Sequence, residues 1–179
     1  MLIRAMVCGL VAASRLLELR QSRRNLAAHP ATDESRLSRR LFPLIVAVHT
    51  TVICGTLLFG HRGPRAFWLL ALLAVQPLRW WVLKTLGNRW NARGAVPRTM
   101  QVATDGPYAF VRHPNYSVIA VELAALPLAF GLGRLAIAAG AANALLLAIR
   151  VREEEALLFR LPGYKEHFAT RPRFLPFLF

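Results

Sequence analysis

Long runs of apolar residues are the feature that most constrains this sequence. A helix that crosses a bilayer needs about 20 predominantly apolar residues, or about 17 at the short end. Five stretches come near that length: 2–19, 41–60, 66–83, 116–130 and 135–149. The last two are separated only by a short connection that contains Gly131 and Gly133, which predicts an antiparallel helical hairpin.

Two of these stretches leave an alternative open. The first contains Arg4, Arg15 and Glu18 and could be a signal peptide, although the later stretches exclude a soluble mature remainder. The third is interrupted by Pro77 and Arg79 and could be a re-entrant or interfacial helix, which would reduce five spans to four.

The charges favour five spans and orient them. The chain has 23 Lys and Arg against 9 Asp and Glu, a formal charge of +14, although 55% of its residues are hydrophobic. Most of the basic residues lie in three regions, 20–40, 84–113 and 150–173. Five spans place these regions on one side of the membrane, and the positive-inside rule makes that side cytoplasmic. The sequence therefore predicts an all-α integral membrane protein of about five transmembrane helices, with the N-terminus outside and a cytoplasmic C-terminal segment.

Several other classes of protein do not fit this pattern. The basic residues are dispersed among loops, so lipid phosphates rather than nucleic acid are the expected partner. Cys8 and Cys54 have neither a disulfide framework nor zinc-type spacing, and no metal site is expected. The composition, rich in Ala and Arg, points to a GC-rich genome, and we expect a multi-pass protein of a bacterial cell membrane.

A polar motif precedes the fourth span. Residues 105–116 contain Gly-Pro-Tyr followed by Arg-His-Pro-Asn-Tyr, and Pro114 suits the first turn of a helix. His113 then lies at the helix entry with Tyr116 about one turn further in, a plausible seat for an anionic group. The alternative is a simple capping turn with an interfacial tyrosine.

The few acidic residues form the second candidate cluster. Glu153, Glu154 and Glu155 are consecutive at the end of the fifth span, where Arg150 and Glu154 share one helical face. A solvated helix end would explain the same run. Glu122 lies well inside an apolar span, which makes it a functional candidate or the partner of an arginine, with Arg15 and Arg79 as the choices.

In combination these motifs resemble the isoprenylcysteine carboxyl methyltransferase family of integral membrane methyltransferases, which is related to the phospholipid methyltransferases. The resemblance covers about residues 85–179. It rests on Gly106-Pro107-Tyr108, Arg112-His113-Pro114-Asn115-Tyr116, the helical hairpin, Arg152-Glu153-Glu154-Glu155-x-x-Leu158, Gly163-Tyr164 and Arg171-x-Arg173-x-x-Pro176. One departure is Val118, where many members carry a glycine.

The resemblance implies S-adenosylmethionine as the methyl donor, bound at the cytoplasmic side under the C-terminal segment. The family pattern assigns the cofactor site to Arg112, His113, Pro114, Tyr116, Glu154 and Glu155, the last two with Glu153 leaving the register uncertain by one. It also assigns Arg171 or Arg173 to the reacting centre.

The expected reaction is methylation of a lipophilic acceptor that enters from the bilayer, either a carboxylate or a phenol. A carboxylate needs only orientation by an arginine, whereas a phenol needs a base, for which Glu122 or His113 are the first candidates. Residues 1–84 are expected to supply N-terminal transmembrane helices, and 85–179 the methyltransferase core. Phospholipid N-methylation and a small non-enzymatic membrane protein are the alternatives.

Overall fold

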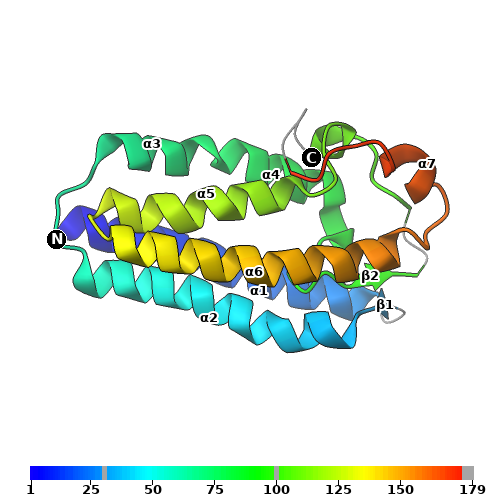
Figure 1. The fold of residues 1–179 in the computed structure, drawn as a ribbon, viewed down its shortest axis with the longest axis horizontal. Helices are drawn as coiled ribbons and strands as arrows, with labels where there is room; N and C mark the ends of the chain where they lie inside the picture. Colours follow the sequence, from blue (N-terminus) through cyan, green and yellow to red (C-terminus); the bar gives the residue numbers. More distant parts are fainter. Residues whose placement is uncertain (30–31, 99–100, 175–179) are drawn as a thin grey trace.

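The computed structural model describes residues 1–29, 32–98 and 101–174. Its helices lie side by side along one long axis (Figure 1). In chain order they are α1 (Leu2–Ala28), α2 (Arg36–Phe59), α3 (Ala66–Ala74), α4 (Gln76–Leu86), α5 (Pro114–Ala129), α6 (Gly133–Leu158) and α7 (Tyr164–Phe168). Short 3₁₀ helices occur at Gly87–Arg89 and Gly106–Ala109, and the two-residue strands β1 (Thr32–Asp33) and β2 (Val96–Pro97) pair antiparallel.

Three of the helical segments are long and apolar enough to cross a membrane: Arg36–Phe59, Ala66–Arg89 and Gly133–Leu158. α5 is a shorter apolar helix. α1 has 27 residues, but its charged side chains keep it outside this class. The architecture expected from the sequence, a helical protein with several apolar spans, is therefore confirmed at this level.

The third predicted span is divided into two helices. Pro77 has no backbone N–H and cannot continue the hydrogen-bond ladder of α3, so the chain turns at Val75. The Gln76 side chain donates to the Leu72 carbonyl at 2.9 Å and satisfies part of the broken ladder. α3 and α4 together still run along the bundle from one end to the other (Figure 1).

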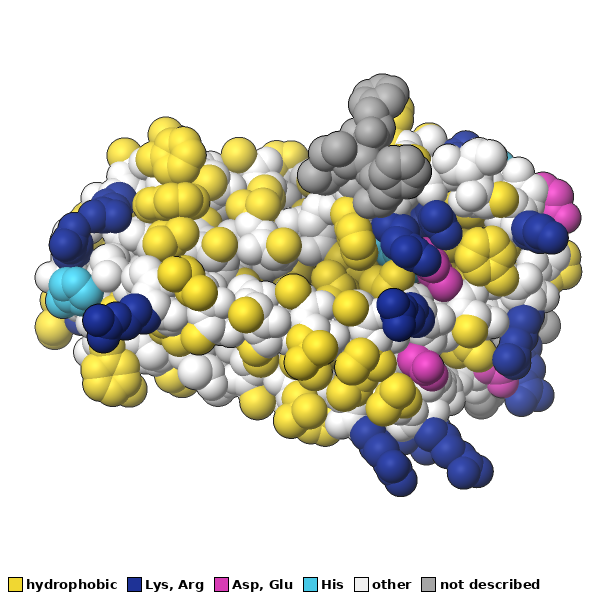
Figure 2. Space-filling view, viewed as in Figure 1, with side chains coloured by type: hydrophobic (Ala, Val, Ile, Leu, Met, Phe, Trp, Pro, Cys, Tyr) yellow, Lys and Arg dark blue, Asp and Glu magenta, His cyan; other side chains and the backbone are white. Residues whose placement is uncertain are grey.

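The helical hairpin is present, with α5 and α6 packed antiparallel around the connection at Gly131 (Figure 1). Pro114 begins α5, as its position after His113 predicted. The segments 28–29, 32–36, 84–98, 101–113 and 158–174 lie at the same end of the bundle, which is called the loop end below. Figure 2 shows hydrophobic side chains across the middle of one face and Lys and Arg toward its two ends.

The apolar core lies in two parts. The larger part fills the bundle away from the loop end, where Val52 of α2, Leu126 of α5 and Phe130 are almost completely buried. The smaller part lies beneath the loops and includes Tyr164 and Phe168 of α7. The polar groups described below lie between these two parts of the core.

A buried charge cluster joins α1 to α4 and α5. Arg79 is only 3% exposed and contacts Glu122 at 2.5 Å and Glu18 at 3.0 Å. Arg15 contacts Glu18 at 2.7 Å and Glu122 at 3.6 Å, and Gln76 donates to the second oxygen of Glu122 at 2.9 Å. The two arginines expected as partners of Glu122 are thus both confirmed, and the cluster is neutral overall.

Removing one member of this cluster is expected to destabilise the protein strongly. In Glu122→Leu the two buried arginines would face a single carboxylate, and an uncompensated buried charge costs about 3–5 kcal/mol. Thermal unfolding in detergent measures the change. Arg39→Ala is the control, because Arg39 is 68% exposed in its pair with Glu34 and its loss should cost about 1 kcal/mol or less.

Candidate functional site

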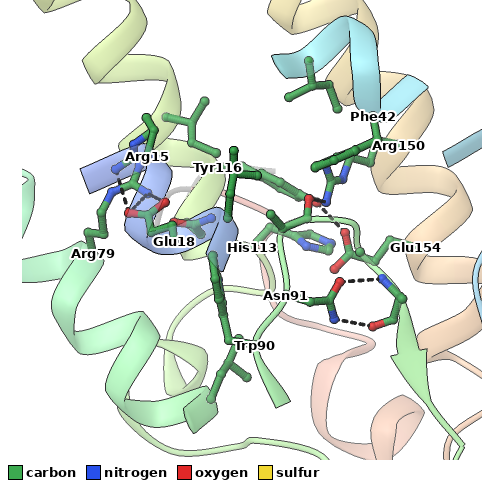
Figure 3. Close-up of a pocket in the computed structure, with 18 of the residues that line it drawn as sticks. Arg15, Glu18, Phe42, Arg79, Trp90, Asn91, His113, Tyr116, Arg150 and Glu154 are labelled. Carbon is green, nitrogen blue, oxygen red and sulfur yellow. Dashed lines mark hydrogen bonds and ion pairs between the residues drawn. The ribbon is translucent and has the colours of Figure 1, made fainter. Parts of the chain in front are cut away.

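A single cavity of about 430 Å³ connects the loop end with the interior of the bundle. Its volume falls within the range of small-molecule sites. The loop-end part is lined by the segment 89–96, the start of α5 and the last turns of α6 (Figure 3). The other part continues between α1 and α2 and reaches the buried charge cluster.

Glu155 organises the loop end from behind the cavity wall. Its carboxylate is 5% exposed and accepts hydrogen bonds from Arg112 at 3.1 Å, His113 at 3.3 Å and Arg173 at 2.8 Å. The contact with Glu155 raises the pKa of Arg173 above its ordinary value, chiefly through the hydrogen bond. One acid therefore joins the end of α6, the start of α5 and the C-terminal segment.

Glu154 faces the opposite direction, into the cavity. It accepts a hydrogen bond from the Tyr116 hydroxyl, while the Arg150 guanidinium lies over the Tyr116 ring at 5.7 Å. Although Arg150 and Glu154 share one helical face, an ion pair between them is not among the contacts of the described residues. Arg150 instead donates to the Ala92 carbonyl at 2.6 Å, which ties α6 to the loop below (Figure 3).

Glu153, the third acid of the run, faces away from the site and accepts from the Ser35 hydroxyl at the start of α2. Ser35 also caps α2 by accepting from the backbone N–H groups of Leu37 and Ser38. The structure therefore gives each of the three acids separate partners: Glu154 faces the cavity, Glu155 lies behind its wall, and Glu153 contacts the start of α2.

The segment 90–95 contains residues that the sequence analysis missed. The Asn91 side chain donates to the Ala95 carbonyl at 2.7 Å and accepts from its N–H at 2.9 Å, which closes a tight loop (Figure 3). Gly94 has a φ of +69°, and a Cβ there would lie 3.1–3.3 Å from Arg150 and Glu154. The sequence Asn-x-x-Gly is a turn signal, but nothing in it indicates which side chains the turn approaches.

Residues 171–174 of the C-terminal segment cross the start of α5 and are called the strap below. The backbone N–H of Arg112 donates to Pro172 at 2.9 Å, that of His113 donates to Arg173 at 2.8 Å, and the Ser117 hydroxyl donates to Phe174 at 2.7 Å. Arg171 donates to the Tyr108 carbonyl at 2.5 Å. This covering segment was expected from the sequence; Pro176, part of the same motif, lies outside the described residues.

Five buried polar atoms on residues that line the cavity have no hydrogen-bond partner among the described residues, and three of them belong to the loop end: Asn115 Oδ1, Arg150 Nε and the Tyr164 hydroxyl. Burial raises the pKa of Tyr164 above its ordinary value, and the Glu154 and Glu155 carboxylates act in the same direction, so the hydroxyl keeps its proton. An unpaired buried donor or acceptor is costly, so these atoms need a partner that the described residues do not supply.

The predicted site residues are only partly brought together. Of the six assigned to the cofactor, Arg112, His113, Tyr116 and Glu154 line the cavity, whereas Pro114 and Glu155 lie behind its wall. Arg171 and Arg173 lie in the strap rather than on the cavity wall, and Glu122 belongs to the charge cluster. Among residues 1–29, 32–98 and 101–174, no group of three His, Cys, Asp or Glu side chains lies close enough together to hold a metal ion.

Comparison with known proteins identifies one family. The model of the "Isoprenylcysteine carboxyl methyltransferase (ICMT) family" matches residues 68–160, just over half of the chain. The matched range includes most of α3 and all of α4, α5 and α6.

Curated relatives match most of the chain. Uncharacterized protein YpbQ of Bacillus subtilis is 26% identical over 86% of this chain and 95% of its own length. The nickel-cobalt-cadmium resistance protein NccN of Alcaligenes xylosoxydans is 29% identical over 87% of this chain and 73% of its own. The cobalt-zinc-cadmium resistance protein CzcN of Cupriavidus metallidurans is 31% identical over 72% and 61%, respectively.

The strap gives a prediction that does not depend on function. Arg173→Gln removes the charge-assisted hydrogen bonds to Glu155, each worth about 1–2 kcal/mol at a partly exposed position. The amide protons of Arg112 and His113 should then exchange roughly tenfold faster, measured by hydrogen exchange. Arg160→Gln, at an exposed position on the same end, is the control, and equal exchange rates in the two variants would contradict the role given to Arg173.

Proposed function

Because the chain belongs to the isoprenylcysteine carboxyl methyltransferase family, we propose that it is an integral membrane methyltransferase that uses S-adenosylmethionine and methylates a lipophilic acceptor. The observation that carries the proposal is the single cavity, polar at the loop end and apolar where it runs between α1 and α2. A polar methyl donor needs a polar binding site, and a lipid-tailed acceptor needs an apolar one next to it.

The loop-end residues fit the donor by the chemistry of their free groups. The Glu154 carboxylate and Asn115 Oδ1 are acceptors suited to ribose hydroxyls or an ammonium group. Arg150 Nε, the Tyr164 hydroxyl and the N-terminus of α5 offer donors suited to a carboxylate. Gly94 leaves space beside Arg150 and Glu154 that any larger residue would fill.

S-adenosylmethionine, when bound, supplies an electrophilic methyl group for in-line displacement. The work left to the protein is to hold the partners in line and to keep out water. Tyr116 orients Glu154, while Glu155 holds His113 and the strap in place. We assign Arg171 and Arg173 as positioning residues of the strap, and Glu122 as the residue that fixes Arg79 at the other end of the cavity.

The route of the acceptor follows from the apolar part of the cavity. Its walls there include Ala12 and Leu16 of α1 and Ile45, Val46 and Ile53 of α2. Leu16 is 66% exposed at the side of the bundle, so the cavity reaches the surface that faces lipid. An acyl or isoprenoid tail can lie between α1 and α2 while its polar head remains inside. In this arrangement residues 85–179 supply the donor site, and the N-terminal helices the acceptor side.

The proposed topology has five crossings, formed by α1, α2, α3 with α4, α5 and α6. The three most basic regions then lie on the cytoplasmic side of the bacterial cell membrane, with the N-terminus outside. Their common position at the loop end supports this arrangement. Labelling of single cysteines at the loop end and at residues 61–65 with a membrane-impermeant reagent tests the orientation.

Binding of S-adenosylmethionine to purified protein in detergent is the first test of the proposed function. Glu154→Gln removes the carboxylate that faces the cavity, and Tyr116→Phe removes the hydroxyl that orients it. Each substitution should weaken binding about tenfold or more. Glu153→Gln is the matched control, since Glu153 is adjacent in sequence but contacts Ser35. Absence of saturable binding by the wild-type protein would exclude the enzyme.

Gly94 provides a steric test. Gly94→Ala places a methyl group against Arg150 and Glu154 and should reduce donor affinity by tenfold or more. Gly87→Ala imposes the same kind of backbone strain, with φ at +53°, but its Cβ meets nothing within 4 Å. We expect it to lower stability without a specific loss of binding, as measured by calorimetric titration and thermal unfolding. Similar affinities for the two variants would count against a donor site beside Gly94.

The acceptor class is determined by product analysis. Membranes that contain the protein are incubated with isotopically labelled S-adenosylmethionine, and lipid-soluble products are identified by mass spectrometry. Membranes that contain the Glu154→Gln variant are the control. A methyl ester or methyl ether agrees with the proposal, and a labelled methylamine on a phospholipid favours N-methylation instead.

A further inference from the structure

The inner part of the cavity contains a second polar site with no part in donor binding. Arg15 and Glu18 line it from α1, Arg79 from α4, and His49 from α2 (Figure 3 for the first three). Ile119, one turn beyond Tyr116, lines the stretch between this site and the loop end. His49 was not among the residues that the sequence predicted to be functional.

The hydrogen bonding of His49 determines which nitrogen carries its proton. Nδ1 lies 2.9 Å from the Ile45 carbonyl, which has only lone pairs, so Nδ1 is the donor. In the neutral ring Nε2 then has a free lone pair, and no described residue donates to it. Other cavity-lining members of α2 are apolar or, like Thr50, donate to a carbonyl of their own helix.

The two bases suggested by the sequence are already engaged. His113 Nε2 is bonded to Glu155 at 3.3 Å. Glu122 accepts from Gln76 through one oxygen and from Arg79 through the other, and it does not line the cavity. A carboxylate paired with arginine is a weak proton acceptor. His49 is the uncommitted base within this cavity.

The same part of the cavity is positively charged. Arg15 and Arg79 both line it, and although they are paired with Glu18 and Glu122, their guanidinium groups stabilise a nearby oxygen that gains negative charge. A free imidazole lone pair in a cavity that also contains two guanidinium groups suits a hydroxyl that must lose a proton.

We propose that this site binds the head of a lipid-tailed phenol and that His49 is the general base for its O-methylation. This proposal rests on the proposed function as a methyltransferase. A carboxylate acceptor is already ionised, and its oxygen lone pairs would repel the lone pair of His49 Nε2. A phenol hydroxyl instead donates a hydrogen bond to Nε2. The tail leaves between α1 and α2, where the cavity is apolar.

The proposed step moves one proton to His49 and one methyl group to the phenol oxygen. Nε2 of His49 takes the phenol proton, and the phenol oxygen forms a bond to the methyl carbon while the carbon–sulfur bond breaks and leaves its electron pair on sulfur. The products are an aryl methyl ether, a neutral thioether and a protonated His49, which returns its proton to water. Arg15 and Arg79 stabilise the charge on the oxygen as it develops.

The test uses two acceptors with the same tail length, 4-dodecylphenol and dodecanoate, with purified protein and S-adenosylmethionine. The wild-type protein should methylate the phenol in preference to the acid. His49→Gln should lower kcat for the phenol about 100-fold, the lower end for loss of a general base, with donor affinity unchanged. Thr51→Val, at an exposed polar position of α2 that does not line the cavity, should retain wild-type kcat.

A more acidic acceptor distinguishes a base from a structural residue. 2,6-Dinitro-4-dodecylphenol is ionised at neutral pH and needs no base, so His49→Gln should methylate it at nearly the wild-type rate. For 4-dodecylphenol the wild-type kcat should fall as pH decreases and His49 becomes protonated, and this dependence should disappear in His49→Gln. The charged or titratable groups that share the cavity with His49 are Arg15, Glu18, Arg79, Arg89, Arg112, His113, Arg150 and Glu154, with Glu122 bound to Arg79.

A readout without donor uses the visible absorption of the nitrophenolate. Bound to the wild-type protein, the probe should ionise at a lower pH than in empty detergent micelles, because the guanidinium groups stabilise its anion. No such shift, preference for dodecanoate, or wild-type kcat in His49→Gln overturns the proposal. Loss of donor binding in both His49→Gln and His49→Asn also overturns it, since His49 would then be structural. Failure of the wild-type protein to bind S-adenosylmethionine identifies failure of the proposed function itself.

Discussion

The loop end depends on one buried carboxylate. Glu155 accepts from Arg112 and His113, which precede α5, and from Arg173 of the C-terminal strap, so it joins two segments that also bond to each other through their backbones. A buried charge is tolerated only when it is paired and hydrogen-bonded, so the acid and its donors fix one another. The position of the C-terminal strap across the start of α5 follows from this arrangement.

A second set of buried charges serves the inner end of the same cavity. Arg79, between Glu18 and Glu122, attaches the charged helix α1 to α4 and α5. Because the set is neutral, it can lie within an apolar bundle although its arginines line the cavity. In the proposed function, the loop end of the cavity binds the donor and the inner end binds the acceptor.

Sequence reasoning found the positions at which polarity conflicts with an apolar environment. It identified the hairpin, the start of α5 at Pro114 and the arginine partners of Glu122, because each has a local or compositional signal. It did not find Asn91, Gly94 or His49. A turn asparagine, a loop glycine and a lone histidine on an apolar helix are each ordinary in sequence, and only their neighbours from other helices give them a role. Pro77 was recognised as an interruption of the third span, but the division of this span into two helices at Val75 was not predicted.

By itself, the sequence determined that the chain forms apolar helices, that its basic residues gather in three regions and that its few acids are exceptional. These follow from the length of apolar runs and the cost of charge in lipid, which are properties of composition and order. Only the tertiary structure decided that Glu153, Glu154 and Glu155 have separate partners, that the strap crosses α5 and that one cavity joins both charge clusters. Contacts of this kind depend on how helices distant in sequence are rotated and packed, and no local pattern specifies that rotation.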